Sequence, residues 1–387
     1  MRRLATLFGL LVAVGCGGSD PAGPPPPAPP PPPPGPPLTG LARIVDSIRS
    51  AHNLPAMAGA IVTLDGVYDL AVAGTRRAGG NAAVTVDDKW HLGSNLKAMT
   101  AALAAMAVDA GVIEWTTTVE EAFPELAGTM RSEYRDVTLE DLLSNRGGIR
   151  NDPPQGTYAG ATPRAQRESA IAWAVTNPPV NARGTFYYSN VGFVMAGAMV
   201  ERAWGEDYES LMQSKLWGPI GVAGAGWGPQ AAVGSNTQPV AHSYVGGGWQ
   251  ACEACDNPPG LSAAGRAHMP IGDWAKVIQE LMKADAGTST LISAGNGRKL
   301  MTAHVPLPNS SDSYGLGWIT TTRTWAQGRT VTHDGSNTVN HSVAWLGLGR
   351  GLAVIATTNA ADLQGGRTAA ALDALVGRMI TFYLGGS

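Results

Sequence analysis

A run of prolines near the N-terminus divides this chain of 387 residues into two parts that cannot fold alike. Residues 21–37 hold 13 of its 28 prolines. Proline has a fixed φ and no backbone N–H, so such a run favours an extended polyproline II spacer over helix or sheet. At about 3.1 Å per residue, the run would reach roughly 50 Å. We therefore expect residues 16–38 to be a disordered, Pro-rich linker and residues 39–387 to form the folded domain.

The residues before the prolines have the pattern of an export signal. Two arginines precede an apolar stretch at 4–14, which has the length of a signal-peptide core and is too short to span a bilayer. The sequence Ala-Val-Gly-Cys that ends at Cys16 resembles the lipobox of bacterial lipoproteins, although alanine stands where leucine is usual. We expect residues 1–15 to be a lipoprotein signal peptide and Cys16 to carry a lipid anchor in the cell envelope or periplasm. Cleavage by ordinary signal peptidase near the same place is the alternative.

The charge pattern limits the partners of the chain. The formal net charge is −3, only 15% of the residues are charged, and no stripe of Lys and Arg is visible. Binding to a nucleic acid backbone needs clustered cations, so we expect no nucleic acid partner. No apolar run reaches the ~18–20 residues of a transmembrane helix, so we expect membrane contact only through the lipid anchor.

Two further cysteines, Cys252 and Cys255, form a lone C-x-x-C. A structural zinc site needs four ligands, and the chain has no second C-x-x-C, although His242 or His268 could complete a site. A thioredoxin-like redox pair belongs in a βαβ setting, which this segment lacks. In an oxidising compartment we expect a local disulfide and no metal.

Hydrophobic periodicity after the linker predicts strands at both ends of the domain and helices in the middle. The expected strands are 57–64, 67–73, 314–320, 329–333, 342–348 and 352–357. The expected helices include 39–52, 97–110, 192–204, 272–285 and 367–384, with further helices starting after capping residues Thr138 and Thr162. We predict an α+β fold in which an antiparallel sheet, built from both chain ends and flanked by helices, receives a mainly helical insert, with the active site in the cleft between them.

One short segment carries the strongest chemical signal, because Ser94 and Lys97 lie three residues apart and share one face of a helix. A serine hydroxyl is a weak nucleophile that needs an adjacent base. A lysine one turn away can be that base if burial or neighbouring cations lower its pKa. The same pair is also compatible with a capped helix start and a solvated lysine.

Two later segments add to this signal. Tyr188 and Asn190 precede a predicted helix; a tyrosine beside a lysine can relay a proton, and an asparagine amide can hold an acyl carbonyl. His333 and Gly335 follow a predicted strand, where glycine lets a backbone N–H approach a substrate closely. Each residue also has a structural interpretation, with Tyr188 as core filler and His333 as a strand-end residue.

The order Ser-x-x-Lys, Tyr-x-Asn, His-x-Gly resembles the serine β-lactamase and penicillin-binding protein family. It is similar to the branch that contains class C β-lactamases, D,D-carboxypeptidases, D-aminopeptidases and esterases. The stretches at 141–148, 314–318 and 357–359 also match, and the resemblance extends from residue 39 to the C-terminus. It implies the α/β/α sandwich of the β-lactamase/transpeptidase-like fold.

The resemblance also implies a mechanism without metal or cofactor. Ser94 would attack a carbonyl and form an acyl-enzyme, and Lys97 and Tyr188 would share the proton transfers. The backbone N–H groups of Ser94 and Ser336 would form the oxyanion hole, beside Gly335. Asn190 would orient the substrate amide. Which of Lys97 and Tyr188 takes the first proton stays open.

The sequence departs from most β-lactamases at His333, where they have a lysine that helps to bind the substrate carboxylate. Because imidazole is mostly uncharged at neutral pH, this favours a peptidase or esterase. A D-amino-acid peptide, a small ester and a β-lactam all remain possible substrates, acted on by a monomer. The alternative is a catalytically inactive, penicillin-binding-like envelope protein. Four tryptophans are candidate pocket aromatics, of which we expect one or two at most to line the pocket and the others to be core residues: Trp90, Trp249, Trp318 and Trp345.

Overall fold

The computed structural model describes residues 40–385 except 152, 155 and 363. The predictions for the signal peptide, the anchor at Cys16, the linker and the capping residue Thr39 lie outside the described residues. These described residues form one compact unit. Within the described part, no helix has the length and apolar character needed to cross a membrane.

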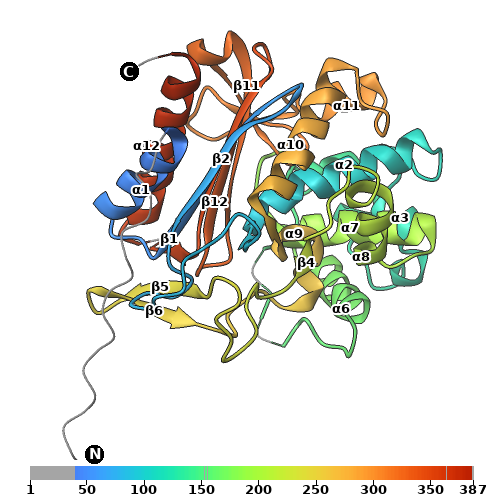
Figure 1. The fold of residues 1–387 in the computed structure, drawn as a ribbon. Coiled ribbons are helices and arrows are strands. Elements are labelled where there is room, and N and C mark those ends of the chain that lie inside the picture. Colours follow the sequence, from blue (N-terminus) through green and yellow to red (C-terminus); the bar gives the residue numbers. More distant parts are fainter. Residues whose placement is uncertain (1–39, 152, 155, 363, 386–387) are drawn as a thin grey trace, which may run out of the picture. The chain divides into compact units, whose positions relative to one another are not determined.

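The centre of the fold is an antiparallel sheet of eight strands that joins the two ends of the domain (Figure 1). Its order is β2-β1-β13-β12-β11-β10-β9-β8. Strand β1 pairs with β13 over the whole register from Met57↔Thr358 to Thr63↔Leu352, which confirms that the first strands join the last ones. The strands are β1 (Ala56–Thr63), β2 (Gly66–Gly74), β8 (Val305–Pro306), β9 (Ser313–Tyr314), β10 (Ile319–Arg323), β11 (Gly328–Ser336), β12 (His341–Gly347) and β13 (Leu352–Thr358).

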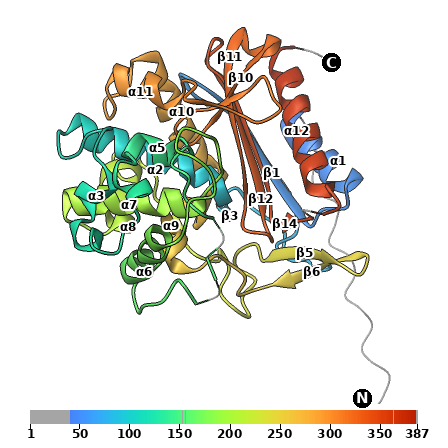
Figure 2. The same ribbon diagram turned by 180° about the vertical axis from the view of Figure 1, so that it is seen from behind.

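Helices cover both faces of this sheet, as the two opposite views show (Figures 1 and 2). Helices α1 (Gly40–Ala51) and α12 (Arg367–Tyr383) lie on one face, and α10 (Ile271–Ala286) and the helical insert lie on the other. The period-two pattern of β1 explains this arrangement, because Met57 and Ile61 pack in the core under α1 and α12 while Ala58 and Ala60 face the larger core. The predicted α+β sandwich is therefore confirmed.

The insert is built from capped helices around α2 and α7. The predicted N-caps are confirmed: Thr138 forms a capping box with Asp141, and Thr162 caps the helix that starts at Pro163. The helices of the insert and its surroundings are α2 (Leu96–Asp109), α3 (Val119–Ala122), α4 (Ser132–Arg135), α5 (Leu139–Leu143), α6 (Pro163–Thr176), α7 (Asn190–Trp204), α8 (Tyr208–Leu211), α9 (Ser262–Gly265) and α11 (Ala294–Leu300). The short turn η1 (Gly93–Asn95) precedes α2.

The described residues also form two small sheets that the periodicity did not predict: β3-β7-β4 and β14-β5-β6. Their strands are β3 (Lys89–His91), β4 (Gly226–Trp227), β5 (Ala241–Val245), β6 (Gly248–Cys252), β7 (Ala267–Pro270) and β14 (Ala360–Ala361). The predicted strand 314–320 is in fact two, β9 and β10, because Gly317 adopts a left-handed φ of 79° between them.

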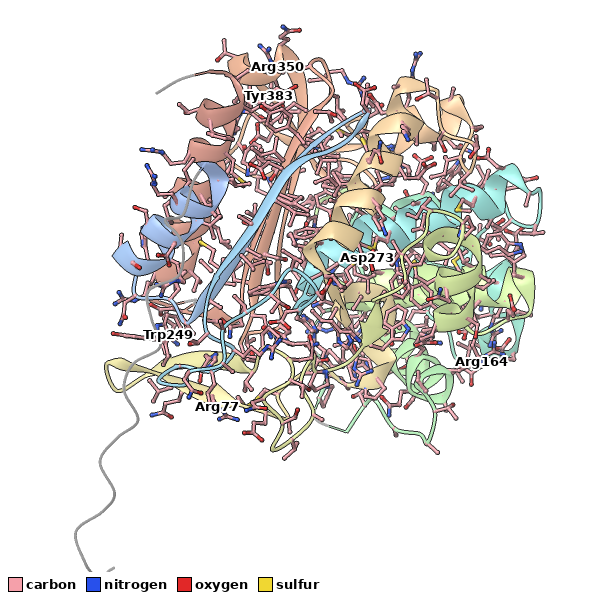
Figure 3. The ribbon with its side chains drawn as sticks, in the orientation of Figure 1. Arg77, Arg164, Trp249, Asp273, Arg350 and Tyr383 are labelled. Atoms are coloured by element: carbon pink, nitrogen blue, oxygen red, sulfur yellow. A yellow bond between two sulfur atoms is a disulfide. The ribbon has the colours of Figure 1, made fainter. Side chains whose placement is uncertain are left out.

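Burial decides the role of two of the four candidate tryptophans. Trp90 and Trp318 are 0% and 1% exposed, so they are core residues and do not line a pocket. Trp249 and Trp345 pack against the core under α1 and α12. Figure 3 shows Trp249 on the β5–β6 hairpin, where its ring N–H donates to the Asn53 carbonyl.

Candidate active site

The nucleophile candidate Ser94 lies in the η1 turn, directly before α2. The turn is held by a hydrogen bond from the Leu92 N–H to the Ala267 carbonyl, 2.9 Å long. Gly93 has a φ of 50° and lies so close to the end of β11 that a Cβ there would overlap the Ser336 nitrogen. Glycine is therefore required in this turn, both by its backbone conformation and by its contact with the sheet.

Lys97 is completely buried one turn after Ser94. Its Nζ lies 3.0 Å from the Ser94 Oγ and donates to the Asn190 Oδ1 and to the Ala264 carbonyl oxygen, both at 2.7 Å. Burial lowers the pKa of Lys97 well below its usual range. A neutral amine has two N–H donors and one lone pair. Once Lys97 has lost its extra proton, the two acceptors use both donors and the lone pair faces the Ser94 hydroxyl.

Tyr188 completes this cluster from the segment before α7. It makes a hydrogen bond with Ser94, and the Lys97 Nζ lies 4.8 Å from the centre of its ring. Burial raises the pKa of Tyr188 above its usual value, more than the hydrogen bond with Ser94 lowers it. The phenol therefore stays protonated at neutral pH and is available as a proton donor.

Two asparagines outside the three catalytic motifs hold the Tyr188 segment by hydrogen bonds. Asn145 has a left-handed φ of 56° and accepts from the backbone on both sides of Tyr188, through its carbonyl from Tyr187 at 2.8 Å and through its Oδ1 from Ser189 at 2.9 Å. The Asn151 Oδ1 accepts from the backbone N–H of Asn190 at 2.6 Å. Asparagine adopts the left-handed region more readily than most residues. Its presence at position 145 was therefore the one local sign of a tight turn there.

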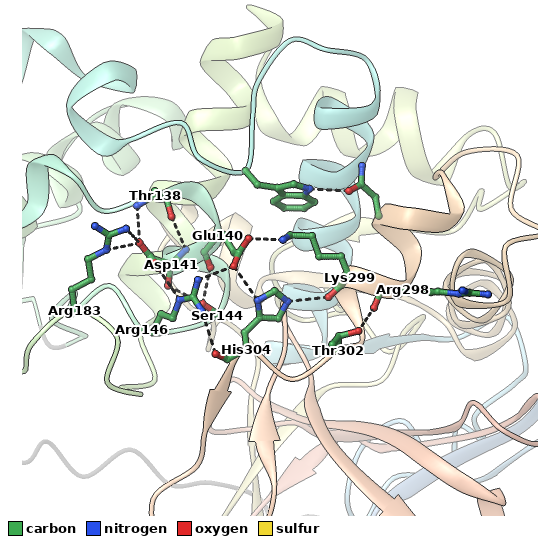
Figure 4. A network of polar contacts seen from close by, with 12 residues as sticks. Thr138, Glu140, Asp141, Ser144, Arg146, Arg183, Arg298, Lys299, Thr302 and His304 are labelled. Atoms are coloured by element: carbon green, nitrogen blue, oxygen red, sulfur yellow. Dashed lines mark hydrogen bonds and ion pairs between the residues drawn. The ribbon is translucent and has the colours of Figure 1, made fainter.

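An ionic cluster, shown in Figure 4, holds Arg146 and with it the turn that contains the neighbouring Asn145. Asp141 accepts from Arg146 and Arg183, each at 2.7 Å, while its neighbour Glu140 accepts from Arg146 at 2.7 Å and lies 3.2 Å from His304. Burial would raise the pKa of Asp141, but the hydrogen bonds from Thr138 and Arg146 outweigh it and the pKa is lowered. The charged Asp141 thus ties this turn to its surroundings.

His333 lies on β11 opposite the Ser94 cluster, with its ring centre 6.1 Å from that of Tyr188. Its Nδ1 donates to the Asp334 carbonyl at 2.6 Å, so its Nε2 accepts from the Tyr314 hydroxyl at 3.1 Å. Burial, followed by the nearby Lys97, lowers the pKa of His333 to about 3. The imidazole is therefore neutral at physiological pH, and both of its nitrogens are engaged within the protein.

Gly335 and Ser336 place the end of β11 beside the nucleophile turn. A Cβ at Gly335 would overlap the Leu92 carbonyl oxygen, so this glycine is needed for contact with the protein's own turn. We expected glycine here because the substrate approaches closely, but the contact with Leu92 already requires it. Ser336 directs its hydroxyl to the Asn340 carbonyl at 2.7 Å. The backbones of Ser94 and Ser336 thus lie on adjoining segments.

The end of β11 has a strand partner on one side only, among the strands that the structure describes. Strand β12 pairs with it as far as Ser336↔His341, whereas β10 pairs with it only as far as Ile319↔Thr332. Residues 333–336 therefore leave one backbone edge unpaired by β10. Such an edge can accept an extended chain by strand addition.

Cys252 and Cys255 are joined by a disulfide, with Cα atoms 5.5 Å apart. Both alternative zinc ligands are hydrogen-bonded to the backbone, His242 through Nδ1 to Asn359 and His268 through Nδ1 to Gly228. Across residues 40–385, apart from the three undescribed positions, no group of three or more His, Cys, Asp or Glu could hold a metal ion.

Comparison with known proteins agrees with this architecture. An unguisins hydrolase from Aspergillus campestris is 27% identical over 271 residues, which is 66% of this chain and 49% of the relative. The chain spans about half the length of the fungal hydrolases it matches. The octameric penicillin-binding protein homologue from Pyrococcus abyssi superposes with a TM-score of 0.73 at 19% identity, covering 90% of this chain and 77% of that one. A D-stereospecific amidohydrolase from Streptomyces sp. gives 0.66 at 19% identity, covering 86% and 97%.

The family assignment comes from a match over almost the whole domain. The Beta-lactamase family model matches residues 41–378. This range contains both sides of the Ser94 cluster and every strand of the large sheet. The chain therefore belongs to the beta-lactamase family.

Proposed function

We propose that this protein is an exported, lipid-anchored serine hydrolase that forms an acyl-enzyme at Ser94 on uncharged esters or amides. One observation carries the proposal. The fully buried Nζ of Lys97 lies 3.0 Å from the Ser94 Oγ, and two acceptors hold its N–H groups. This arrangement suits a base that activates a serine nucleophile.

Acylation is a proton transfer coupled to attack. The Ser94 Oγ forms a bond with the carbonyl carbon of the substrate while the lone pair of Lys97 accepts the hydroxyl proton. The new ammonium keeps its hydrogen bonds to Asn190 and Ala264, which stabilise its charge. Lys97 suits the role of base better than Tyr188, because the raised pKa of Tyr188 disfavours the phenolate.

The other groups fit the later steps. Tyr188, protonated and bonded to Ser94, can donate a proton to the leaving group and regain it from Lys97. The Asn190 Oδ1 is bound to Lys97, so its amide Nδ2 remains for the acyl carbonyl of the substrate. The backbone N–H groups of Ser94 and Ser336 are the proposed oxyanion donors. Water then cleaves the acyl bond and restores the Ser94 hydroxyl.

The substrate class follows from the charge of the sheet side. His333 is neutral, and the exposed residue beside it is the acidic Asp334. Neither residue offers a cation to a substrate carboxylate, which argues against peptides with a free C-terminus and against β-lactams. Neutral esters and D-amino-acid amides fit better. The relatives named as a hydrolase and as a D-stereospecific amidohydrolase support this choice.

Turnover by the wild type and by Ser94→Ala tests the proposal. A suitable panel contains p-nitrophenyl esters, a D-alanine anilide, a D-Ala-D-Ala peptide and a chromogenic cephalosporin. We expect esters and the anilide to be turned over by the wild type alone, and the two carboxylate-bearing compounds to be poor substrates. Equal turnover by Ser94→Ala would reject the hydrolase, and preference for the carboxylates would reject the substrate class. Binding without turnover would favour the inactive penicillin-binding-like alternative.

Export and anchoring are tested separately from catalysis. The proposal predicts that the mature protein starts at Cys16 with an acylated cysteine, and that Cys16→Ser releases it from membranes. Mass spectrometry of the mature N-terminus provides the measurement. An unmodified N-terminus at another residue would contradict the lipid anchor.

A further inference from the structure

We propose that Asp256 is a positioning residue that holds the two segments carrying the oxyanion donors next to each other. The inference rests on the proposed hydrolase function. Asp256 lies directly after the disulfide, in the loop between β6 and α9, and its side chain is only 4% exposed. It contacts one residue near Ser94 and one residue after Ser336. Because it is buried, it acts through these neighbours and does not reach the substrate.

The first connection runs to the nucleophile turn. The Asp256 Oδ1 lies 2.9 Å from the Nε2 of His91, whose side chain is completely buried. The Nδ1 of His91 accepts from the Gly93 N–H at 3.1 Å, so the proton of the ring is on Nε2, facing the carboxylate. The N–H is not well aligned with the oxygen, so the contact is a close polar pair. Through it, Asp256 sets the position of the residue that precedes Ser94.

The second connection runs to the end of β11. The same Asp256 oxygen accepts from the Asn337 Nδ2 at 3.0 Å. The Asn337 Oδ1 accepts from both the backbone and the side-chain nitrogen of Asn340, each at 3.0 Å. The Asn340 carbonyl in turn accepts from the Ser336 hydroxyl at 2.7 Å. Asp256 therefore fixes the turn that follows Ser336.

The residues before and after Asp256 in the sequence hold it in place. The disulfide between Cys252 and Cys255 constrains the residues before it. After it, the Asn257 side chain donates to the Gly265 carbonyl at 2.7 Å, and the Asn257 carbonyl accepts from the Arg266 Nε at 3.0 Å. The Asp256 Oδ2 lies 3.6 Å from the same Arg266 nitrogen. Burial would raise the pKa of Asp256, but the close His91 ring and the hydrogen bond from Asn337 lower it overall, so it is charged.

This arrangement matters because an oxyanion hole depends on the separation of its donors. Donors must lie about 2.7–3.1 Å from the position that the negative oxygen takes, and losing one costs about 10²–10³ in kcat. One donor is on η1 and the other on β11, which belong to different parts of the fold. A single carboxylate oxygen that contacts both neighbourhoods can keep that separation constant.

The test compares three variants of the full-length protein. Asp256→Ala removes both connections, Asp256→Asn keeps an acceptor oxygen in the same place, and Asp285→Ala is the matched control. Asp285 is also buried and paired with an arginine, its Oδ1 lying 2.7 Å from the Arg329 guanidinium, but it lies at the end of α10. The readouts are kcat and KM on a p-nitrophenyl ester, inhibition by a boronic acid that mimics the tetrahedral intermediate, and amide hydrogen exchange of peptides spanning 91–97 and 334–340.

We expect Asp256→Ala to lower kcat about 100-fold with KM little changed, to weaken boronic acid binding in proportion, and to speed exchange in both peptides. Asp256→Asn should recover most of the kcat, and Asp285→Ala should change only stability. The inference is overturned if Asp256→Ala behaves like the control, if KM alone changes, or if one peptide alone exchanges faster. If the wild type lacks Ser94-dependent turnover, the proposed function has failed, and the exchange of the two peptides alone decides the inference.

Discussion

The two sides of the candidate site differ in how their side chains are used. On the helical side, formed by η1, α2, α7 and α9, the polar groups bind one another, and Lys97 joins Ser94, Asn190 and Ala264 at 2.7–3.0 Å. On the sheet side, the polar side chains of β11 that are not exposed bind within the protein: His333 is bound to Tyr314 and to the Asp334 carbonyl, and Ser336 to the Asn340 carbonyl. The helical side therefore supplies reactive groups and the sheet side supplies backbone. Substitutions on the two sides should have different consequences.

The largest effect is expected at Lys97 on the helical side. Lys97→Met keeps the length of the side chain but removes the base, so kcat/KM on an ester should fall about 10³-fold, within the range of general base catalysis. In the wild type, kcat/KM should rise with pH as Lys97 loses its proton and level off well below pH 10.5, because burial lowers its pKa.

A pH–rate profile of the wild type and of Lys97→Met checks this prediction. The variant should lack the rise that belongs to Lys97. A variant that keeps the wild-type rate and pH profile would show that the helical side does not supply the base.

The next effect concerns the sheet side, where the buried neutral imidazole of His333 should make the protein less stable in acid. The pKa of His333 is about 3 in the folded protein and about 6.5 in an unfolded chain. Between these values the unfolded chain binds more protons, so the free energy of unfolding falls as the pH drops from 6.5 towards 3. At pH 4 the loss is about 3 kcal/mol for this one group.

His333→Gln retains a donor and an acceptor but cannot be protonated in this range. Urea unfolding at pH 7 and pH 4 should therefore show a smaller acid loss for the variant than for the wild type. An equal loss in both proteins would mean that His333 is not a buried neutral imidazole.

A smaller effect is expected from packing on the sheet side. Gly335→Ala adds a methyl group that overlaps the Leu92 carbonyl oxygen and pushes β11 away from η1. We expect a loss of about 1–3 kcal/mol in stability from overpacking. The displacement of β11 would separate the backbone donors of Ser94 and Ser336, so kcat should fall. Lys97 is unchanged, so the pH dependence of the rate should be retained.

Thermal unfolding together with the pH–rate profile separates these two consequences. The matched control is Gly66→Ala, because the space around Gly66 is open, although its φ of 152° lies at the edge of the left-handed region. A Gly335→Ala variant with full activity would show that the contact between η1 and β11 does not define the site.

The smallest effect is expected at the disulfide, which lies outside both sides but precedes Asp256. Cys252 and Cys255 are three positions apart, and closing so short a loop stabilises the fold by about 2 kcal/mol in the chain-entropy account. Replacing both with serine should lower stability by about this amount and reduce kcat less than Asp256→Ala does. A kcat as low as that of Asp256→Ala would move the positioning role from Asp256 to the disulfide.

The parts of the fold that depend on local pattern could be predicted from the sequence. The strands at 57–64, 342–348 and 352–357 and the caps at Thr138 and Thr162 are clear because periodicity and capping act within a few residues. The two-residue strands β4, β8 and β14 exist only through their partners, and no local pattern distinguishes them. The break of 314–320 into two strands depends on the left-handed φ of Gly317, which the alternating pattern does not reveal.

The same division applies to the site. The motifs predicted that Ser94, Lys97, Tyr188 and Asn190 belong together, and the structure brings them within hydrogen-bond distance or ring contact. The neutral state of His333 depends first on burial and then on the nearby Lys97, and the burial arises from tertiary packing, so the motif indicated it only weakly. Asp256 could not be predicted, because its partners His91 and Asn337 are far away in the sequence.

The central claim is that a buried neutral lysine activates Ser94, and the rate of covalent labelling by a fluorophosphonate tests it most directly. Intact-mass and peptide mass spectrometry would follow the label as a function of pH. The account predicts one label per chain, on Ser94, with a rate that rises with pH, reaches a plateau well below pH 10.5, and collapses in Lys97→Met. Labelling at another residue, or labelling of Lys97→Met at the wild-type rate, would contradict it.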